Sequence, residues 1–129
     1  MAQSMDTFWF EPDNIKNMKN FRWEKGRQDS GYYKMLIFTA KFPLPFDWYI
    51  LKYPVGSSIP EHTDKVDIGK HYRLNIILKK PKIGGVFSCS RTILNTNRIK
   101  LFRPDLYAHS LSMIEEGERI VMSIGWVTG

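Results

Sequence analysis

The sequence contains a single cysteine, Cys89, and only three histidines among its 129 residues. One cysteine excludes an intrachain disulfide, which suits a reducing compartment, and we therefore expect a cytoplasmic protein. No apolar run is as long as a membrane-spanning helix requires. The N-terminal residues also lack the basic and apolar segments of a signal peptide. We accordingly expect no association with a membrane.

The composition also lacks the features of a disordered chain. Hydrophobic residues make up 43% and charged residues 25%, as in ordinary globular domains. We predict one domain spanning residues 1–129. The net charge of +6 indicates either a soluble domain with a basic surface or an acidic partner such as nucleic acid. We find no RNA-binding signature and no zinc-finger spacing.

Helix signals are scarce and strand signals dominate. Asp13 is a suitable cap for a short helix ending at Asn20, and polar residues 24–31 indicate a loop. Seven or eight short, turn-separated strands predict an antiparallel sandwich or a double-sheet jelly roll. The predicted strands cover residues 33–42, 46–53, 71–79, 85–90, 92–94, 98–102, 109–114 and 119–127.

One short motif suggests a metal site at a strand end. His62 and Asp64 are two residues apart, so their side chains project to the same side of an extended chain. Together they supply two of the three ligands of the 2-His-1-carboxylate Fe(II) site. An isolated His-x-Asp often arises by chance, and His109 alone could be a structural histidine. A jelly roll can nevertheless bring His109 beside His62, and we expect the turn at residues 116–117 to place Arg119 on the strand adjacent to His109.

The joint order of these residues resembles a known family. His62-Thr63-Asp64, then His109, then Arg119 is similar to the His-x-Asp…His…Arg pattern of the 2-oxoglutarate and Fe(II)-dependent dioxygenases. The flanking segments resemble the prolyl hydroxylase-like branch of that superfamily. These segments are Tyr53-Pro54-Val55-Gly56, Arg73-Leu74-Asn75-Ile76-Ile77-Leu78, Gly84-Gly85-Val86-Phe87, Leu101-Phe102-Arg103-Pro104-Asp105 and Gly117-Glu118-Arg119 through Gly125-Trp126.

The resemblance implies a double-stranded β-helix (a cupin-like jelly roll) with a catalytic core at about residues 46–127. It implies His62, Asp64 and His109 as Fe(II) ligands, and Arg119 as the partner of the distal carboxylate of 2-oxoglutarate. Arginine suits that role because its planar fork binds carboxylates bidentately. Further candidates for co-substrate contacts are Ser123, Tyr53 and Asn75, and for the last two core packing is an equally good interpretation. Arg73, on the same face as Asn75, is a weaker competitor of Arg119.

The resemblance also implies a reaction. Such an enzyme uses Fe(II), 2-oxoglutarate and O₂, with ascorbate as an optional reductant, to hydroxylate a C–H bond and release succinate and CO₂. The branch indicates a protein or peptide substrate. One alternative is a nucleic-acid or small-molecule oxygenase, although the nucleic-acid branch usually carries two arginines on its closing strand and here only Arg119 is present. Another alternative is a non-catalytic, cupin-like binding module.

Overall fold

The computed structural model describes residues 21–26, 30–41 and 44–129. Within these ranges every regular element is a β-strand, which confirms the all-β prediction, and no helix is long and apolar enough to cross a membrane. The helix predicted at residues 13–20 lies outside the described residues. The strands are β1 (Trp23–Lys25), β2 (Tyr33–Ala40), β3 (Phe46–Tyr53), β4 (Ile59–His62), β5 (Lys70–Lys79), β6 (Ile83–Gly84), β7 (Phe87–Cys89), β8 (Leu94–Asn95), β9 (Ile99–Phe102), β10 (His109–Leu111), β11 (Ile114–Glu116) and β12 (Arg119–Thr128).

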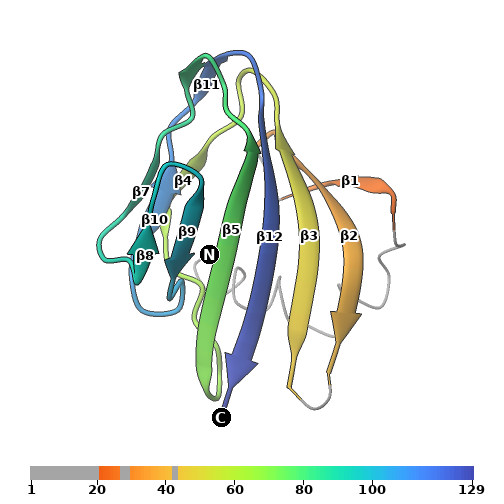
Figure 1. Cartoon of the computed structure of the whole chain (residues 1–129), viewed down its shortest axis with the longest axis vertical. Coiled ribbons are helices and arrows are strands. Elements are labelled where there is room, and N and C mark those ends of the chain that lie inside the picture. The colour runs from red at the N-terminus through yellow and green to blue at the C-terminus, as the bar shows by residue number, and fades with distance from the viewer. Residues whose placement is uncertain (1–20, 27–29, 42–43) are drawn as a thin grey trace.

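Seven strands form one large antiparallel sheet in the order β1-β2-β3-β12-β5-β9-β8. The central strand β12 lies between β3 and β5, and these long strands stand side by side in Figure 1. Ser123 is opposite Asn75 on β5, and Gly125 is opposite both Asp47 on β3 and Arg73 on β5. Directly opposed residues share a face of the sheet, so this register gathers polar side chains on one wall.

That wall is the inner face of the sheet. Along β5, buried and partly exposed residues alternate, as expected for a strand with one covered face. The buried positions include His71, Arg73 and Asn75 as well as Ile77. Charged side chains are rarely fully buried unless they are paired or bind a ligand, so a polar inner face indicates a site rather than a plain core.

A smaller sheet in the order β4-β10-β7 covers this wall, and β11 pairs with β6 in a third, two-stranded unit. Leu111 and Ile114 pack in one buried cluster with Leu51 and Val121 of the large sheet. The two main sheets therefore enclose a common interior, with the short strands β4, β10 and β7 on one side of the long ones in Figure 1.

Two local predictions were wrong. Residues 24–31 were expected to form a loop, and this was wrong at Glu24 and Lys25, which belong to β1 and pair with the edge of β2, because backbone pairing does not require apolar side chains. Arg119 was expected on the strand adjacent to His109. The pairing of β11 with β6 instead separates β10 from β12, so Arg119 lies in the large sheet opposite Tyr53 and faces the small sheet across the interior.

Candidate metal centre

Strand pairing places the histidine of the His-x-Asp motif next to His109. His62 ends β4, His109 begins β10, and the two residues are directly opposed in the small sheet. Their ring centroids are 4.3 Å apart. Asp64 follows two residues after His62, where its backbone N–H donates to the carbonyl of Pro104 at 2.6 Å. This bond fixes the carboxylate beside the loop that leads to His109.

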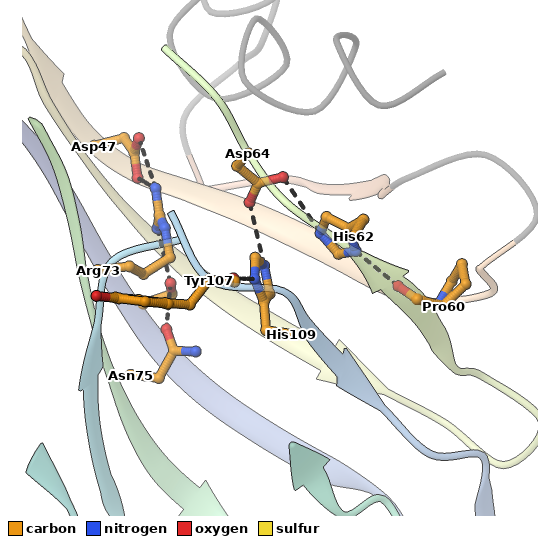
Figure 2. A network of polar contacts seen from close by, with 9 residues as sticks. Asp47, Pro60, His62, Asp64, Arg73, Asn75, Tyr107 and His109 are labelled. Carbon is orange, nitrogen blue, oxygen red and sulfur yellow. Dashed lines mark hydrogen bonds and ion pairs between the residues drawn. The ribbon is translucent and has the colours of Figure 1, made fainter. Parts of the chain in front are cut away.

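The three side chains converge on one point, as Figure 2 shows. Nε2 of His62 lies 3.3 Å from Oδ1 of Asp64, and Nε2 of His109 lies 3.4 Å from Oδ2. The three ligand atoms, one from each residue, all lie within 4.8 Å of one another. Two ligands at right angles, each roughly 2.1 Å from one ion, are about 3.0 Å apart. The two nitrogen–oxygen distances are therefore close to those between neighbouring ligands of an octahedral ion.

The hydrogen bonds of the rings determine which nitrogen faces the carboxylate. Nδ1 of His62 lies 2.7 Å from the carbonyl oxygen of Pro60, and Nδ1 of His109 lies 3.0 Å from that of Tyr107. A carbonyl only accepts, so each neutral ring carries its proton on Nδ1 and a lone pair on Nε2. This arrangement, in which a backbone carbonyl orients the ring, is usual for metal-binding histidines.

Both lone pairs thus point at a carboxylate that is itself an acceptor. Asp64 is 2% exposed, and its Oδ1 has no hydrogen-bond donor in the described part of the chain. Three acceptors that meet without a donor need a cation between them, and two imidazoles with one carboxylate suit Fe(II).

A cavity extends from these three side chains into the barrel. The space that the centre of a water molecule can occupy inside it is about 60 Å³. One buried water needs roughly 10–15 Å³ measured in the same way. The cavity can therefore hold a small ligand beside an ion, while a larger substrate must remain at its mouth. Its walls include the apolar side chains of Leu51, Phe87 and Phe102 and the polar side chains of Tyr53, Arg73, Asn75, Arg119 and Ser123.

Arg119 lines the cavity without a carboxylate partner in the part of the chain that the structure describes. It is 3% exposed, its guanidinium carbon lies 5.3 Å from the ring centre of Tyr53, and its Nη2 has no hydrogen-bond partner among the described residues. Burial lowers the pKa of Arg119, and the neighbouring Tyr53 opposes that shift. Burial raises the pKa of Tyr53. The charge of Arg119 is therefore costly to bury, and Tyr53 keeps its proton and does not neutralise it. An anion bound against this guanidinium would reduce the cost, since a buried donor without a partner is unfavourable.

Arg73 is equally buried but is paired with a carboxylate. Its Nη2 donates to Oδ1 and Oδ2 of Asp47 at 2.9 and 3.1 Å, and its Nη1 donates to Oγ of Ser123 at 2.8 Å. The Ser123 hydroxyl donates to Oδ1 of Asn75 at 2.6 Å. Figure 2 shows Arg73 between Asp47 and Asn75. A Cβ on Gly125 would overlap the guanidinium, so only glycine at this position leaves room for Arg73.

The structure thus brings all seven predicted site residues to one cavity, with His62, Asp64 and His109 at one point and Tyr53, Asn75, Arg119 and Ser123 on the facing wall. The sequence interpretation missed Asp47 and Gly125. Asp47 occupies a buried position of β3, where alternation with apolar neighbours places a charge on the inner face. That charged residue within an apolar strand was the available signal. Gly125 was noted only as the end of a segment that resembles the family, and not as a site residue.

Comparison with known proteins supports the fold only. No family model matches the chain, and no curated protein matches it in sequence. The cupin domain of Schizosaccharomyces pombe Cnp3 is similar with a TM-score of 0.58 and 14% identity, covering 83% of this chain and 69% of that one. KdgF from Halomonas sp. gives 0.53 and 12%, covering 84% and 87%. A cupin-2 domain of Rhodospirillum rubrum gives 0.53 and 12%, covering 86% and 76%. The chain therefore has the cupin-type double-stranded β-helix fold.

Proposed function

We propose that the protein is an Fe(II)- and 2-oxoglutarate-dependent dioxygenase that hydroxylates a C–H bond of a protein or peptide. One observation carries this proposal: two imidazole nitrogens and a carboxylate converge on one point, and they share a small cavity with a buried arginine that has no carboxylate partner among the described residues. The fold is compatible, because the cupin-type superfamily includes 2-oxoglutarate oxygenases as well as proteins without enzymatic activity.

The charges of the cavity favour a dianionic ligand. Asp47 neutralises Arg73 through a buried ion pair, so this pair contributes no net charge. A divalent ion would add two positive charges, of which the Asp64 carboxylate cancels one, and Arg119 restores one. The remaining charge of about +2 is what a dicarboxylate such as 2-oxoglutarate would balance, because uncompensated buried charge is expensive.

Each group of residues has a distinct task in this proposal. The carbonyls of Pro60 and Tyr107 hold the two imidazoles with Nε2 toward the ion. Arg119 binds and orients the distal carboxylate of the co-substrate. Leu51, Phe87 and Phe102 exclude water from the cavity. Bound iron with 2-oxoglutarate supplies the oxidising chemistry, as is usual where a cofactor carries the reaction and the protein supplies orientation.

The substrate class rests on the resemblance to the prolyl hydroxylase-like branch and on the size of the cavity. Once a small co-substrate occupies it, only a projecting side chain can enter, which suits an extended peptide lying across the mouth. The segment between Asp64 and β5 (residues 65–70) and the β8–β9 hairpin are the proposed peptide contacts. Oxidation of a nucleic acid, which the net charge of +6 would suit, is the competing substrate class within the same mechanism.

The test is an anaerobic titration of the purified protein with Fe(II) and then with 2-oxoglutarate. The expected result is a weak visible charge-transfer band that appears only when both are bound. Asp64→Asn should abolish the band, because an amide cannot replace the negative charge of the ligand. The matched control is Asp67→Asn, three residues further along, where the side chain is exposed and the band should be unchanged.

Two outcomes would contradict the proposal. Absence of the band with the unmodified protein, together with tight binding of another metal or ligand, would favour a non-catalytic, cupin-like binding module. A band that persists in Asp64→Asn would show that the ion is bound elsewhere. Given the band, succinate release that requires an added peptide would establish the substrate class, and release that requires an oligonucleotide would replace it with the competing one.

A further inference from the structure

The buried polar row Asp47–Arg73–Ser123–Asn75 has a fixed direction of hydrogen bonding. Arginine has only donors, so Nη1 of Arg73 must donate to Oγ of Ser123 across 2.8 Å. The serine hydroxyl is then free to donate onward, and it does so over 2.6 Å to the side chain of Asn75. Only the amide oxygen of Asn75 can accept this proton, because an amide NH₂ group has no acceptor capacity.

The orientation of the Asn75 amide follows from this chain of donors. Its oxygen faces Ser123, so its NH₂ group is turned the other way, and Asn75 lines the cavity. Within the described ranges the structure gives this NH₂ group no hydrogen-bond partner. The ion pair at the far end of the row anchors the orientation, since Arg73 is held by both oxygens of Asp47 and is 3% exposed.

We infer that Asp47, Arg73 and Ser123 are positioning residues that hold the Asn75 amide so that its NH₂ group donates to an oxygen of the bound dicarboxylate. This inference rests on the proposed function, because it requires 2-oxoglutarate in the cavity. It assigns Ser123 a role through Asn75 rather than in direct contact with the co-substrate. It also explains why the wall of the cavity contains a fully buried ion pair, where apolar side chains would be enough to form a core.

A double-mutant cycle separates positioning from direct contact. The protein is loaded with Co(II), which permits binding without turnover, and 2-oxoglutarate affinity is measured by calorimetry. Asn75→Ala should weaken binding by roughly 10-fold or more, because a hydrogen bond to a charged group is lost. Ser123→Ala should weaken binding by about 3- to 10-fold in the native background, because the amide is then free to turn its oxygen to the ligand.

The decisive arm is Ser123→Ala in the Asn75→Ala background. If the serine acts only through the amide, the second substitution should cause no further loss of affinity, and the two effects should be strongly non-additive. Independent effects that multiply would overturn the inference and would mean that Ser123 contacts the co-substrate itself. Ser123→Thr, which keeps the hydroxyl, should restore the native affinity.

Controls distinguish this result from loss of folding and from failure of the proposed function. Ser57→Ala removes another buried hydroxyl hydrogen bond, from Ser57 to the carbonyl of Pro54, outside the cavity, so it should leave affinity unchanged. Co(II) affinity should be the same in all variants, because none of them alters a metal ligand. If the unmodified Co(II) protein does not bind 2-oxoglutarate at all, the proposed function fails, and the inference fails with it. Binding with multiplicative effects overturns only the inference.

Discussion

The two buried arginines of the cavity differ in one respect that separates structure from function. Arg73 and Arg119 are each 3% exposed and each line the same cavity. Arg73 forms an ion pair with Asp47, whereas Arg119 lies over the ring of Tyr53 and has no hydrogen-bond partner for its Nη2 among the described residues. The same side chain is thus neutralised at one position and left available at the other.

The difference shows how the fold assigns roles to similar residues. A buried cation with its own carboxylate stabilises the wall, and one without a carboxylate is suited to a ligand that brings the missing charge. The neighbours of each arginine determine which of the two cases applies. Asp47 and Gly125 are opposed across β3 and β12, where Asp47 supplies the charge and Gly125 the space for the guanidinium of Arg73. No equivalent carboxylate lies opposite Arg119, whose partner across the sheet is Tyr53.

The largest expected effect comes from removing the neutralised arginine. Arg73→Met leaves Asp47, which is fully buried, without its cation, and breaking a buried pair in this way costs about 3–5 kcal/mol of unfolding free energy. Urea denaturation at neutral pH measures the loss. Burial already raises the pKa of Asp47 to about 6 although Arg73 opposes the shift, so removal of Arg73 should raise it further. The loss should therefore shrink as the pH falls and Asp47 becomes protonated.

The control for this prediction is the double variant Asp47→Asn/Arg73→Met. It removes both charges, and most of the stability should return, since neutral replacements of a buried ion pair are often tolerated. A single Arg73→Met variant as stable as the unmodified protein would contradict the view that this ion pair is structural.

The same substitution at the other arginine should give the opposite pattern. Arg119→Met removes a buried cation that has no carboxylate partner in residues 21–26, 30–41 and 44–129, so the unfolding free energy should stay the same or increase. The affinity of the metal-loaded protein for 2-oxoglutarate should fall by roughly 100-fold, because the distal carboxylate loses a charged, hydrogen-bonding partner. Calorimetry with the Co(II) protein measures this change.

A matched arginine outside the cavity completes the comparison. Arg98 is exposed and donates to the backbone carbonyl of Ile77, so Arg98→Met should leave the affinity for 2-oxoglutarate unchanged. Unaltered affinity in Arg119→Met, or an equal fall in Arg98→Met, would refute the assignment of Arg119 to the co-substrate.

Much of the fold and of the metal centre could be predicted because their signals are local. The strand predicted at residues 46–53 coincides with β3, and the alternating residues 71–79 fall within β5. The i, i+2 spacing of His62 and Asp64 placed both side chains on one side of the chain, and the resemblance supplied His109 as their partner. These inferences need only the chain's own periodicity and a motif of fixed order.

The rest could not be predicted because it depends on register between distant strands. Whether Asp47 meets Arg73 depends on the pairing of β3 and β5 with β12, which brings residues 26 positions apart into contact. The expected adjacency of Arg119 and His109 failed for the same reason. A short hairpin would have paired their strands, but the pairing of β11 with β6 redirects the chain into the other sheet. Local spacing does not encode either outcome.

A third buried cation, Lys34 on the neighbouring strand β2, extends the comparison. Lys34 is 4% exposed, and burial lowers its pKa to about 7, although Glu24 and Asp47 oppose the shift. The unfolded chain keeps the proton up to a pH of about 10, so between these values the unfolded state binds more protons. Unfolding free energy should therefore rise with pH in this range, relative to a variant without the amine.

Lys34→Met tests this prediction. The variant should exceed the unmodified protein in unfolding free energy by roughly 2 kcal/mol at pH 7, and the difference should narrow toward pH 10, because removing the proton that the unfolded lysine carries then costs less. Urea denaturation at both pH values provides the measurement. A difference that is constant or grows with pH would mean that Lys34 stays charged in the folded protein and that the neighbouring carboxylates compensate its burial.

The smallest effect is expected at an ion pair that lies on the surface, immediately before Arg119. Nζ of Lys79 is 3.3 Å from a carboxylate oxygen of Glu118, and the two side chains are 56% and 35% exposed. Solvent screens such a pair, so Glu118→Gln should change the unfolding free energy by less than about 0.5 kcal/mol. It should also leave 2-oxoglutarate affinity unchanged, because the carboxylate of Glu118 points to Lys79 rather than to Arg119. A large loss of stability would mean that exposure is a poor guide to the strength of ion pairs in this fold. A rise in affinity would mean that Glu118 already offsets part of the charge on Arg119, and the contrast between the paired and the unpaired arginine would then be one of degree.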